Sequence, residues 1–296
     1  MTSSGAKAAA LPQPSRPRNS GMREPTKSVA CSIWRELRAI DGKRTIPEET
    51  PIAFTYDGGS YAVMMATPLN LEDFAVGFSF TEGVIAAPAD IRQLEVVEHD
   101  AGVELRMWLN EPRGSALTER RRHLTGPTGC GLCGIDSLYE AVRPVARVRE
   151  GQSFTAAEIM RALEALPSRQ ELNRLTRAVH AAAFWRPDSG LVAVREDVGR
   201  HNALDKLAGA MLRDAASGEN GMVLLTSRVS VEMVQKSAAM GAPLIVCVSA
   251  PTALAVRTAE AAGLTLIAVA RSDGFEVFTH GQRIKQTAKE AVSDVA

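Results

Sequence analysis

The second half of the chain repeats one pattern that restricts its fold more than any other feature: a short apolar run, then a stretch with helical periodicity. The apolar runs cover residues 191–194, 222–226, 244–248 and 264–269. Short runs that do not alternate with polar residues are typical of strands buried on both faces, as in parallel sheets. The sequence therefore predicts an α/β fold with a mostly parallel sheet.

The segments between these runs predict helices on both faces of that sheet. They span residues 201–212, 230–240 and 252–262, and each ends at a glycine or a polar turn. Connections of this length between parallel strands form right-handed crossovers, which bring each helix back onto the sheet. We therefore expect a core domain over residues 125–296.

The first half predicts a smaller α+β lobe over residues 29–124. Apolar residues alternate along 52–65 around an Asp-Gly-Gly turn, which is typical of a β-hairpin. A helix should follow, capped by Asn70 and ended by Gly83. Two further strands are expected at residues 91–98 and 103–109.

Composition limits the setting in which the chain works. The formal net charge is +0, so nothing indicates nucleic-acid binding, and no stretch has the roughly 20 apolar residues of a membrane span. Four cysteines in 296 residues do not make a disulfide scaffold. We expect a soluble, cytoplasmic protein. Residues 1–28, rich in Ala, Ser, Pro and Arg, carry too little apolar surface to fold and are predicted to be a disordered tail.

Cys130 and Cys133 form a CxxC pair within the glycine-rich segment 125–134. The apolar residues that follow have the spacing of one helix face, which places Cys133 near the start of a predicted helix. Unpaired N–H groups and the positive end of the helix dipole favour a thiolate there. The segment is therefore a candidate site for sulfur or redox chemistry.

Other interpretations of the CxxC pair stay open. A structural zinc site needs four ligands, but Cys31, Cys247 and the five histidines supply no second close pair. A thioredoxin-like redox pair normally follows a strand directly, whereas glycines surround this one. The two cysteines can also be plain structural residues of a glycine-rich turn.

Polar residues follow the predicted strands at their carboxyl ends, where open α/β sheets bind ligands. Three of these ends carry Arg195, Arg228 and Arg271, and the planar guanidinium group suits phosphate. The sequence therefore predicts a site for a large phosphorylated ligand. The other residues expected there are Asp197, His201, Asn202, Ser227, Ser249 and Thr252.

Some of these residues also have structural interpretations. Asp197 can pair with a neighbouring arginine, and Asn202 can cap a helix. Glu232 and Lys236 lie four residues apart, the spacing of an intrahelical ion pair that needs no functional account. His180 precedes an apolar segment and is expected to be a core or strand residue rather than a metal ligand.

Several blocks of the chain resemble the formate dehydrogenase accessory family FdhD. They are MATPLNLEDFAVG at 65–77, GCGLCGIDS at 129–137, REDVGRHNALDK at 195–206, and SRVSVEMVQK at 227–236 with the segment 249–252. The resemblance runs from about residue 48 to residue 281. Blocks of this length in this order are highly specific.

The resemblance implies a sulfur carrier. In such proteins a cysteine desulfurase delivers sulfur to the CxxC loop as a persulfide, which passes to the molybdenum bis-guanine-dinucleotide cofactor of formate dehydrogenase. The family pattern makes Cys130 the carrier and Cys133 its partner, although the dipole argument alone favours Cys133. GDP-like nucleotides should bind, and the family implies a homodimer. It also adds to the cofactor site Ala270, Arg271, Ser272, Asp273, Gly274 and Phe275.

The resemblance further implies a core like that of the cytidine deaminases. A zinc deaminase needs an H-x-E motif followed by P-C-x-x-C. Here the CxxC pair comes first, no proline precedes Cys130, and Ala182 stands two residues after His180, so deamination is not expected. A cofactor-binding chaperone without catalysis and a thiol redox protein are the remaining alternatives.

Overall fold

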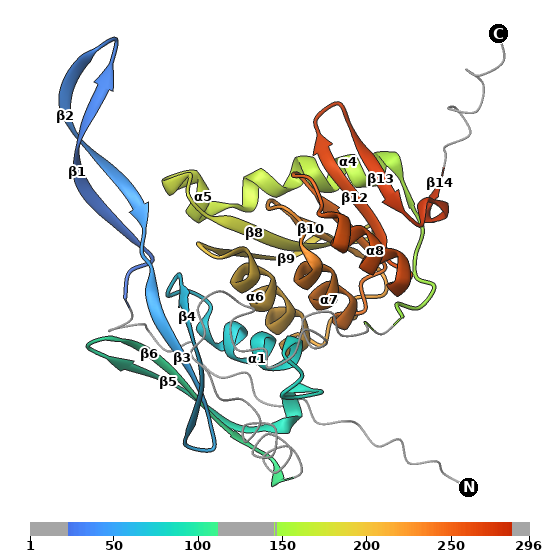
Figure 1. Cartoon of the computed structure of the whole chain (residues 1–296), viewed down its shortest axis with the longest axis horizontal. Coiled ribbons are helices and arrows are strands. Elements are labelled where there is room, and N and C mark those ends of the chain that lie inside the picture. The colour runs from blue at the N-terminus through green and yellow to red at the C-terminus, as the bar shows by residue number, and fades with distance from the viewer. Residues whose placement is uncertain (1–22, 112–144, 146, 286–296) are drawn as a thin grey trace, which may run out of the picture.

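The computed structural model describes residues 23–111, 145 and 147–285 of the chain (Figure 1). Within these ranges it shows a projecting hairpin, a four-stranded sheet with one helix, and a six-stranded sheet with helices on both faces. None of the described helices is both long enough and apolar enough to cross a membrane. The α/β class is confirmed.

The chain enters the described part through a hairpin that forms a sheet of its own. Strands β1 (Thr26–Arg35) and β2 (Arg38–Pro47) pair in antiparallel register and stand away from the body (Figure 1). The turn residues Glu36 and Leu37 have φ values of 49° and 65°, as tight hairpin turns require. Strand β1 thus begins inside the segment 1–28 that was expected to be disordered, whereas residues 1–22 lie outside the described residues.

The lobe sheet has the strand order β4-β3-β6-β5 and packs one face against α1. Its core contains an aromatic group, in which the Phe54 ring lies 5.0 Å from that of Phe74 and 4.1 Å from that of Phe78. The predicted hairpin and both later strands are confirmed. The elements are β3 (Thr50–Tyr56), β4 (Gly59–Ala66), α1 (Leu71–Thr81), η1 (Pro88–Asp90), β5 (Ile91–His99) and β6 (Gly102–Leu109).

The start of α1 differs from the expectation. Asn70 precedes the helix, but its φ of 54° is left-handed and its side chain makes no capping bond. An asparagine tolerates this conformation better than most residues, so backbone geometry rather than capping accounts for Asn70 here. The helix does end as predicted, with Gly83 in the left-handed region at a φ of 73°.

The core sheet is mixed and not mostly parallel. Its order is β13-β12-β11-β10-β8-β9, in which β10, β11 and β12 run parallel while β8 and β13 are antiparallel to their neighbours. The strands are β8 (His180–Arg186), β9 (Gly190–Asp197), β10 (Met222–Leu225), β11 (Leu244–Cys247), β12 (Thr265–Arg271) and β13 (Gly274–Thr279). The expected likeness to cytidine deaminases stays a prediction.

Strand β8 is one reason why the prediction of a mostly parallel sheet was wrong. Three alanines, Ala181 to Ala183, make its central stretch a weak strand former in isolation. It becomes a strand because it lies between β9 and β10, where it is buried on both faces. Since it is antiparallel to both, β9 runs in the same direction as β10.

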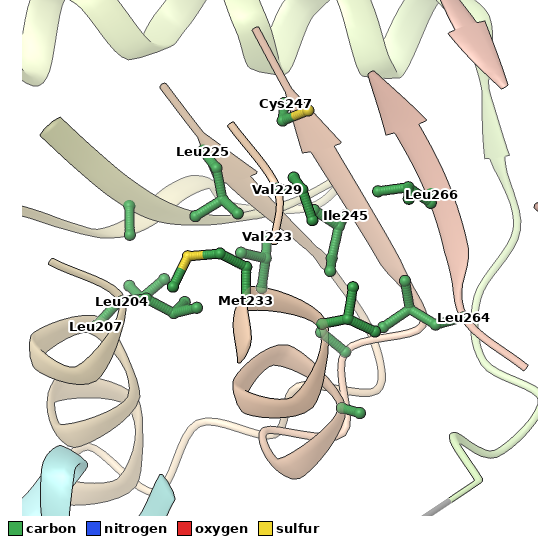
Figure 2. Packing of buried hydrophobic residues seen from close by; sticks show 14 of the residues in the cluster. Leu204, Leu207, Val223, Leu225, Val229, Met233, Ile245, Cys247, Leu264 and Leu266 are labelled. Atoms are coloured by element: carbon green, nitrogen blue, oxygen red, sulfur yellow. The ribbon is translucent and has the colours of Figure 1, made fainter. Parts of the chain in front are cut away.

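Helices cover both faces of the core sheet, but the three helices predicted at residues 201–212, 230–240 and 252–262 all lie on one face. On one face α6 (Arg200–Arg213), α7 (Val231–Ala239) and α8 (Ala253–Ala262) pack against the sheet through side chains such as Leu204 and Met233 (Figure 2). On the other face α4 (Ala156–Ala165) contributes Ile159. The remaining short elements are β7 (Phe154–Thr155), η2 (Leu166–Arg169), α5 (Glu171–Thr176), η3 (Gly281–Arg283) and β14 (Ile284–Lys285).

The lobe and the core meet where α1 crosses α6. A Cβ atom added at Gly77 of α1 would overlap the carbonyl oxygen of Asp205, and one added at Gly209 of α6 would overlap that of Asp73. Each glycine therefore faces the backbone of the other helix. Only glycine allows helix backbones to approach this closely.

We expect Gly77→Ala to lower the free energy of unfolding by more than about 2 kcal/mol, because the added methyl group meets backbone that cannot move aside. Urea denaturation of the full chain measures the change. Gly281→Ala is the matched control, since its added Cβ would make only an ordinary contact, 3.5 Å from a Val277 methyl carbon. Equal stability of the two variants would contradict this account of the helix crossing.

Candidate functional site

The carboxyl ends of β9, β10, β11 and β12 meet at one edge of the core sheet, here called the carboxyl edge. The loops that leave these strands are tied to one another. Val248 N–H donates to the Leu225 carbonyl at 3.0 Å, and Thr252 N–H donates to that of Val229 at 2.9 Å. The predicted convergence of strand ends is therefore present in the fold.

Some of the predicted site residues are exposed at this edge. Arg228 is exposed, and its guanidinium has no hydrogen-bond or ion-pair partner within the described residues. Arg271 is also exposed, but its guanidinium donates to the carbonyls of Val248 and Ala270. Thr252 caps α8, because its hydroxyl accepts from Ala255 N–H at 3.2 Å. The other exposed members are Ser272 and Asp273.

The remaining members of the predicted site at these strand ends are less exposed to solvent. Ser227 is buried and donates to the carbonyl of Arg228 at 3.0 Å. The Ser249 carbonyl accepts from Val269 N–H at 3.2 Å. The residues that are buried or partly buried around them are Ala270, Gly274 and Phe275, the last of which packs against the core.

Val269 has an unusual backbone conformation for its type. Its φ is 51°, in the left-handed region that β-branched residues rarely adopt, and the register with β13 shifts between Ala268 and Arg271. Such bulges re-aim side chains at the end of a strand. Strained conformations persist where the surroundings impose them, and they cluster at functional sites. The bulge directly precedes the predicted ligand residues Ala270 and Arg271.

Asp197 is not available at the edge. Its side chain is completely buried, and its carboxylate lies 2.5 Å from the ammonium of Lys206, which is also buried. The same carboxylate accepts from the backbone N–H groups of Thr67 and Gly199 and from the Asn202 amide. The role of Asp197 that these contacts support is to fix the loop 197–202 against the lobe.

Arg195 and Asn202 are likewise engaged inside the protein. Arg195 pairs with Asp73 of α1 at 2.7 Å, and Arg213 binds the other oxygen of Asp73 at 2.6 Å. Asn202 donates to the carbonyl of Met65 at 2.8 Å. Arg195 lies within β9 near its carboxyl end and Asn202 in the first turn of α6, and both join the core to the lobe rather than face solvent.

A second buried ion pair lies beside the first. Lys236 of α7 donates to both oxygens of Asp205 at 2.8 and 3.0 Å and to Glu82 at 3.0 Å. Burial acts to lower the pKa of Lys236, but the two carboxylates outweigh it and raise the pKa. The expected intrahelical pair between Glu232 and Lys236 is therefore wrong, because Lys236 points toward α1 and α6.

Glu232 instead faces His201 across the starts of α7 and α6. Oxygen Oε2 of Glu232 lies 3.9 Å from Nε2 of His201. His180 begins β8 at the same edge, as the strand residue that was predicted. Its burial, together with the nearby positive charge of Arg200, lowers its pKa. The histidines and Glu232 thus make this end of the carboxyl edge polar but largely covered.

Cys247 is a buried strand residue, as predicted. Its thiol donates to the carbonyl of Ser249 at 2.7 Å, and burial raises its pKa to about 12. A thiol that stays protonated at neutral pH is a poor nucleophile. Cys247 therefore matters for packing rather than for chemistry.

Cys130 and Cys133 lie outside the described residues, so their roles stay predictions. Within the ranges that are described, His, Cys, Asp and Glu side chains form no group of three able to hold a metal ion. The roles assigned to the carboxyl-edge residues also stay predictions, although the geometry separates those that are exposed from those that are buried.

The fold and this edge define an α/β protein whose strand-end loops carry arginines and hydroxyls. A family model described as the FdhD/NarQ family matches residues 47–285. The chain belongs to this family, which confirms the resemblance of the sequence blocks.

Similar proteins cover nearly the whole chain. The sulfur carrier protein FdhD of Agrobacterium fabrum is 51% identical over 259 residues, which cover 87% of this chain and 96% of that protein. The protein of the same name from Cupriavidus necator is 46% identical over 268 residues, covering 90% and 93%. A crystal structure from Desulfotalea psychrophila, described as a formate dehydrogenase accessory protein, has a TM-score of 0.68 at 25% identity and covers 88% of this chain and 100% of that one.

The buried ion pair between Asp197 and Lys206 yields a prediction that distinguishes a structural role of Asp197 from a role in ligand binding. Lys206→Met leaves the Asp197 carboxylate buried without its partner, which should lower the free energy of unfolding by about 3–5 kcal/mol. Urea denaturation measures the loss, and Asp197→Asn combined with Lys206→Met should restore part of it. Arg149→Met, which removes the exposed pair with Glu219, is the control and should change little. Full stability of Lys206→Met would contradict the structural role.

Proposed function

We propose that this protein is a sulfur carrier, as its relatives are named, and that it serves formate dehydrogenase. The family match over residues 47–285 carries this proposal. The glycine-rich CxxC segment supports it from the sequence side, since a thiolate flanked by glycines can accept and release sulfur. The exposed arginines of the carboxyl edge support it from the structural side.

The first step is the loading of sulfur. A cysteine desulfurase is the proposed donor, and its own persulfide supplies the terminal sulfur atom. The thiolate of Cys130 attacks that atom, so one S–S bond breaks in the donor and another forms on Cys130, with the donor thiolate as leaving group and no net oxidation. Cys133 is the proposed partner in acceptance or release.

The second step delivers the sulfur to a molybdenum bis-guanine-dinucleotide, which we treat as the substrate of the carrier. In this step the Cys133 thiolate attacks the inner sulfur of the Cys130 persulfide, so that a Cys130–Cys133 disulfide forms and the outer sulfur leaves as sulfide; a thiol reductant then restores both cysteines. The carboxyl edge fits the phosphates of this ligand. Arg228 is exposed and its guanidinium has no partner among the described residues, and the Arg271 guanidinium meets only backbone carbonyls. Both are suited to bind phosphate oxygens by charge-assisted hydrogen bonds.

The buried members of the predicted site have a supporting role in this proposal. Arg195, Asp197 and Asn202 anchor the loop between β9 and α6 to Asp73, Lys206 and the lobe backbone. A loop that is held in this way can present His201 without a large loss of entropy on binding. We also propose a cytoplasmic homodimer.

The sulfur-transfer step is tested by Cys130→Ala. Incubation of the full chain with a cysteine desulfurase and cysteine should load sulfane sulfur onto the wild type but not onto this variant, because the accepting thiolate is gone. Cys247→Ala is the matched control and should load normally, since that thiol is buried and protonated. A strain carrying only Cys130→Ala should lack formate dehydrogenase activity. Normal activity in that strain would refute the carrier role of Cys130.

The phosphate site is tested by Arg228→Ala. We expect GDP to bind the wild type with an affinity that falls as salt rises, and Arg228→Ala to weaken binding by about tenfold or more, because a charge-assisted hydrogen bond is lost. Isothermal titration calorimetry measures both. Arg161→Ala, an exposed arginine on the opposite helical layer, is the control. An unchanged affinity of Arg228→Ala would remove Arg228 from the site.

A further inference from the structure

Buried polar atoms without a partner are concentrated at one end of the carboxyl edge. In the part of the chain that the structure describes, eight buried side-chain nitrogen or oxygen atoms lack a hydrogen bond. Five of them belong to the first two residues of α6, to the first five residues of α7 or to the residue that precedes α7. These five are Arg200 Nε, His201 Nε2, Ser230 Oγ, Glu232 Oε2 and Gln235 Nε2.

Such a concentration calls for an explanation, because buried polar groups in proteins nearly always have partners. Leaving one unpaired costs roughly 1–3 kcal/mol. Ordered water can satisfy single atoms. A group drawn from two helices, with donors and an acceptor side by side, also matches a ligand that offers the complementary set.

Glu232 is the acceptor of this group, and its Oε2 atom has no hydrogen bond within the described residues. Lys236, its neighbour one turn along α7, is occupied by Asp205 and Glu82. His201 faces it at 3.9 Å, which is too long for a hydrogen bond but close enough for attraction. The His201 ring and the Ser230 hydroxyl lower the pKa of Glu232 to about 2 against the effect of burial, so the carboxylate is ionised at neutral pH. Its side chain keeps 15% of its surface exposed.

An ionised carboxylate distinguishes guanine from adenine by elementary chemistry. The Watson–Crick edge of guanine carries two adjacent donors, the ring N1–H and the exocyclic amino group, which both carboxylate oxygens can accept. Adenine presents an unprotonated ring nitrogen at the same place, so its lone pair would meet a negative oxygen. The guanine carbonyl beside these donors needs a donor in return, and Gln235 and Arg200 each have an unpartnered nitrogen.

We propose that Glu232 is the specificity-determining residue that selects guanine at the carboxyl edge, by accepting hydrogen bonds from the base. This inference rests on the proposed function, in which a guanine dinucleotide is the substrate, and adds the residue that recognises its base. Glu232 lies on the helix that follows the Arg228 loop, so a nucleotide whose phosphates meet Arg228 has its base within the same strand-end region.

The charges around Glu232 favour this assignment over a purely structural one. The groups that act on it are His201 of α6 and Ser230 just before its own helix, while Asp197 is turned inward to Lys206. Glu232 is not held by a lysine, unlike Asp197 and Asp205. A neutral substitute there removes the acceptor without disturbing either buried ion pair.

The test uses the full chain with Glu232→Gln and three nucleotides, GDP, IDP and ADP, in calorimetric titrations. A glutamine offers one acceptor and one donor, the pattern that pairs with adenine. For the wild type we expect GDP to bind about tenfold or more tightly than ADP, and IDP, which lacks the exocyclic amino group, to fall between them. For Glu232→Gln we expect GDP to weaken by about tenfold and ADP to bind as well as GDP or better.

Glu260→Gln is the matched control, since Glu260 also faces a histidine, His280 at 3.7 Å, but lies on the exposed surface of α8. It should keep the wild-type preference. A Glu232→Gln variant that folds normally and still prefers GDP would overturn the proposal, as would equal binding of GDP and ADP by the wild type, although the phosphate site would then stand. Failure of every nucleotide to bind would overturn the phosphate site as well, whereas sulfur loading on Cys130 would be unaffected.

Discussion

The close crossing of α1 and α6 is the constraint on which the rest of the structure depends. Gly77 and Gly209 bring the two backbones into contact, and this contact joins the small lobe to the core sheet. With the helices so close, charged side chains beside them such as Asp73, Asp205 and Lys206 are buried. The charged groups in this layer must therefore find partners within it.

These charged groups form ion pairs, several of which join the lobe to the core. Asp73 of α1 holds Arg195 and Arg213, and Lys236 of α7 bonds to Asp205 and to Glu82 just beyond α1. The cost of burying such pairs is large, and their attraction offsets it only with good geometry. Their benefit is positional, because they fix the starts of α6 and α7, where the proposed nucleotide site lies.

Residues 195–206, which run from the end of β9 into α6, contribute both to the buried ion pairs and to the carboxyl edge. Within residues 195–206, Asp197 and Lys206 point inward and meet at 2.5 Å, whereas His201 lies partly exposed at the edge. Side chains that look alike in sequence, all polar and all after a strand, thus divide into supports and contacts. The bulge at Val269 has a similar effect on the far side of the edge, where it re-aims the segment that carries Arg271.

The sequence by itself determined the α/β class, the three helices of the core, the hairpin 52–65 and the convergence of strand ends, because hydrophobic periodicity and turn residues are local signals. It also determined the family, through the CxxC block and the block 195–206. Only the tertiary structure decided the antiparallel β8, since its alanines form a strand only between two neighbours. It also decided that Asp197 and Lys236 are buried. Both residues bond to the lobe more than a hundred residues away, Asp197 to Thr67 and Lys236 to Glu82, and such contacts cannot be read from spacing along the chain.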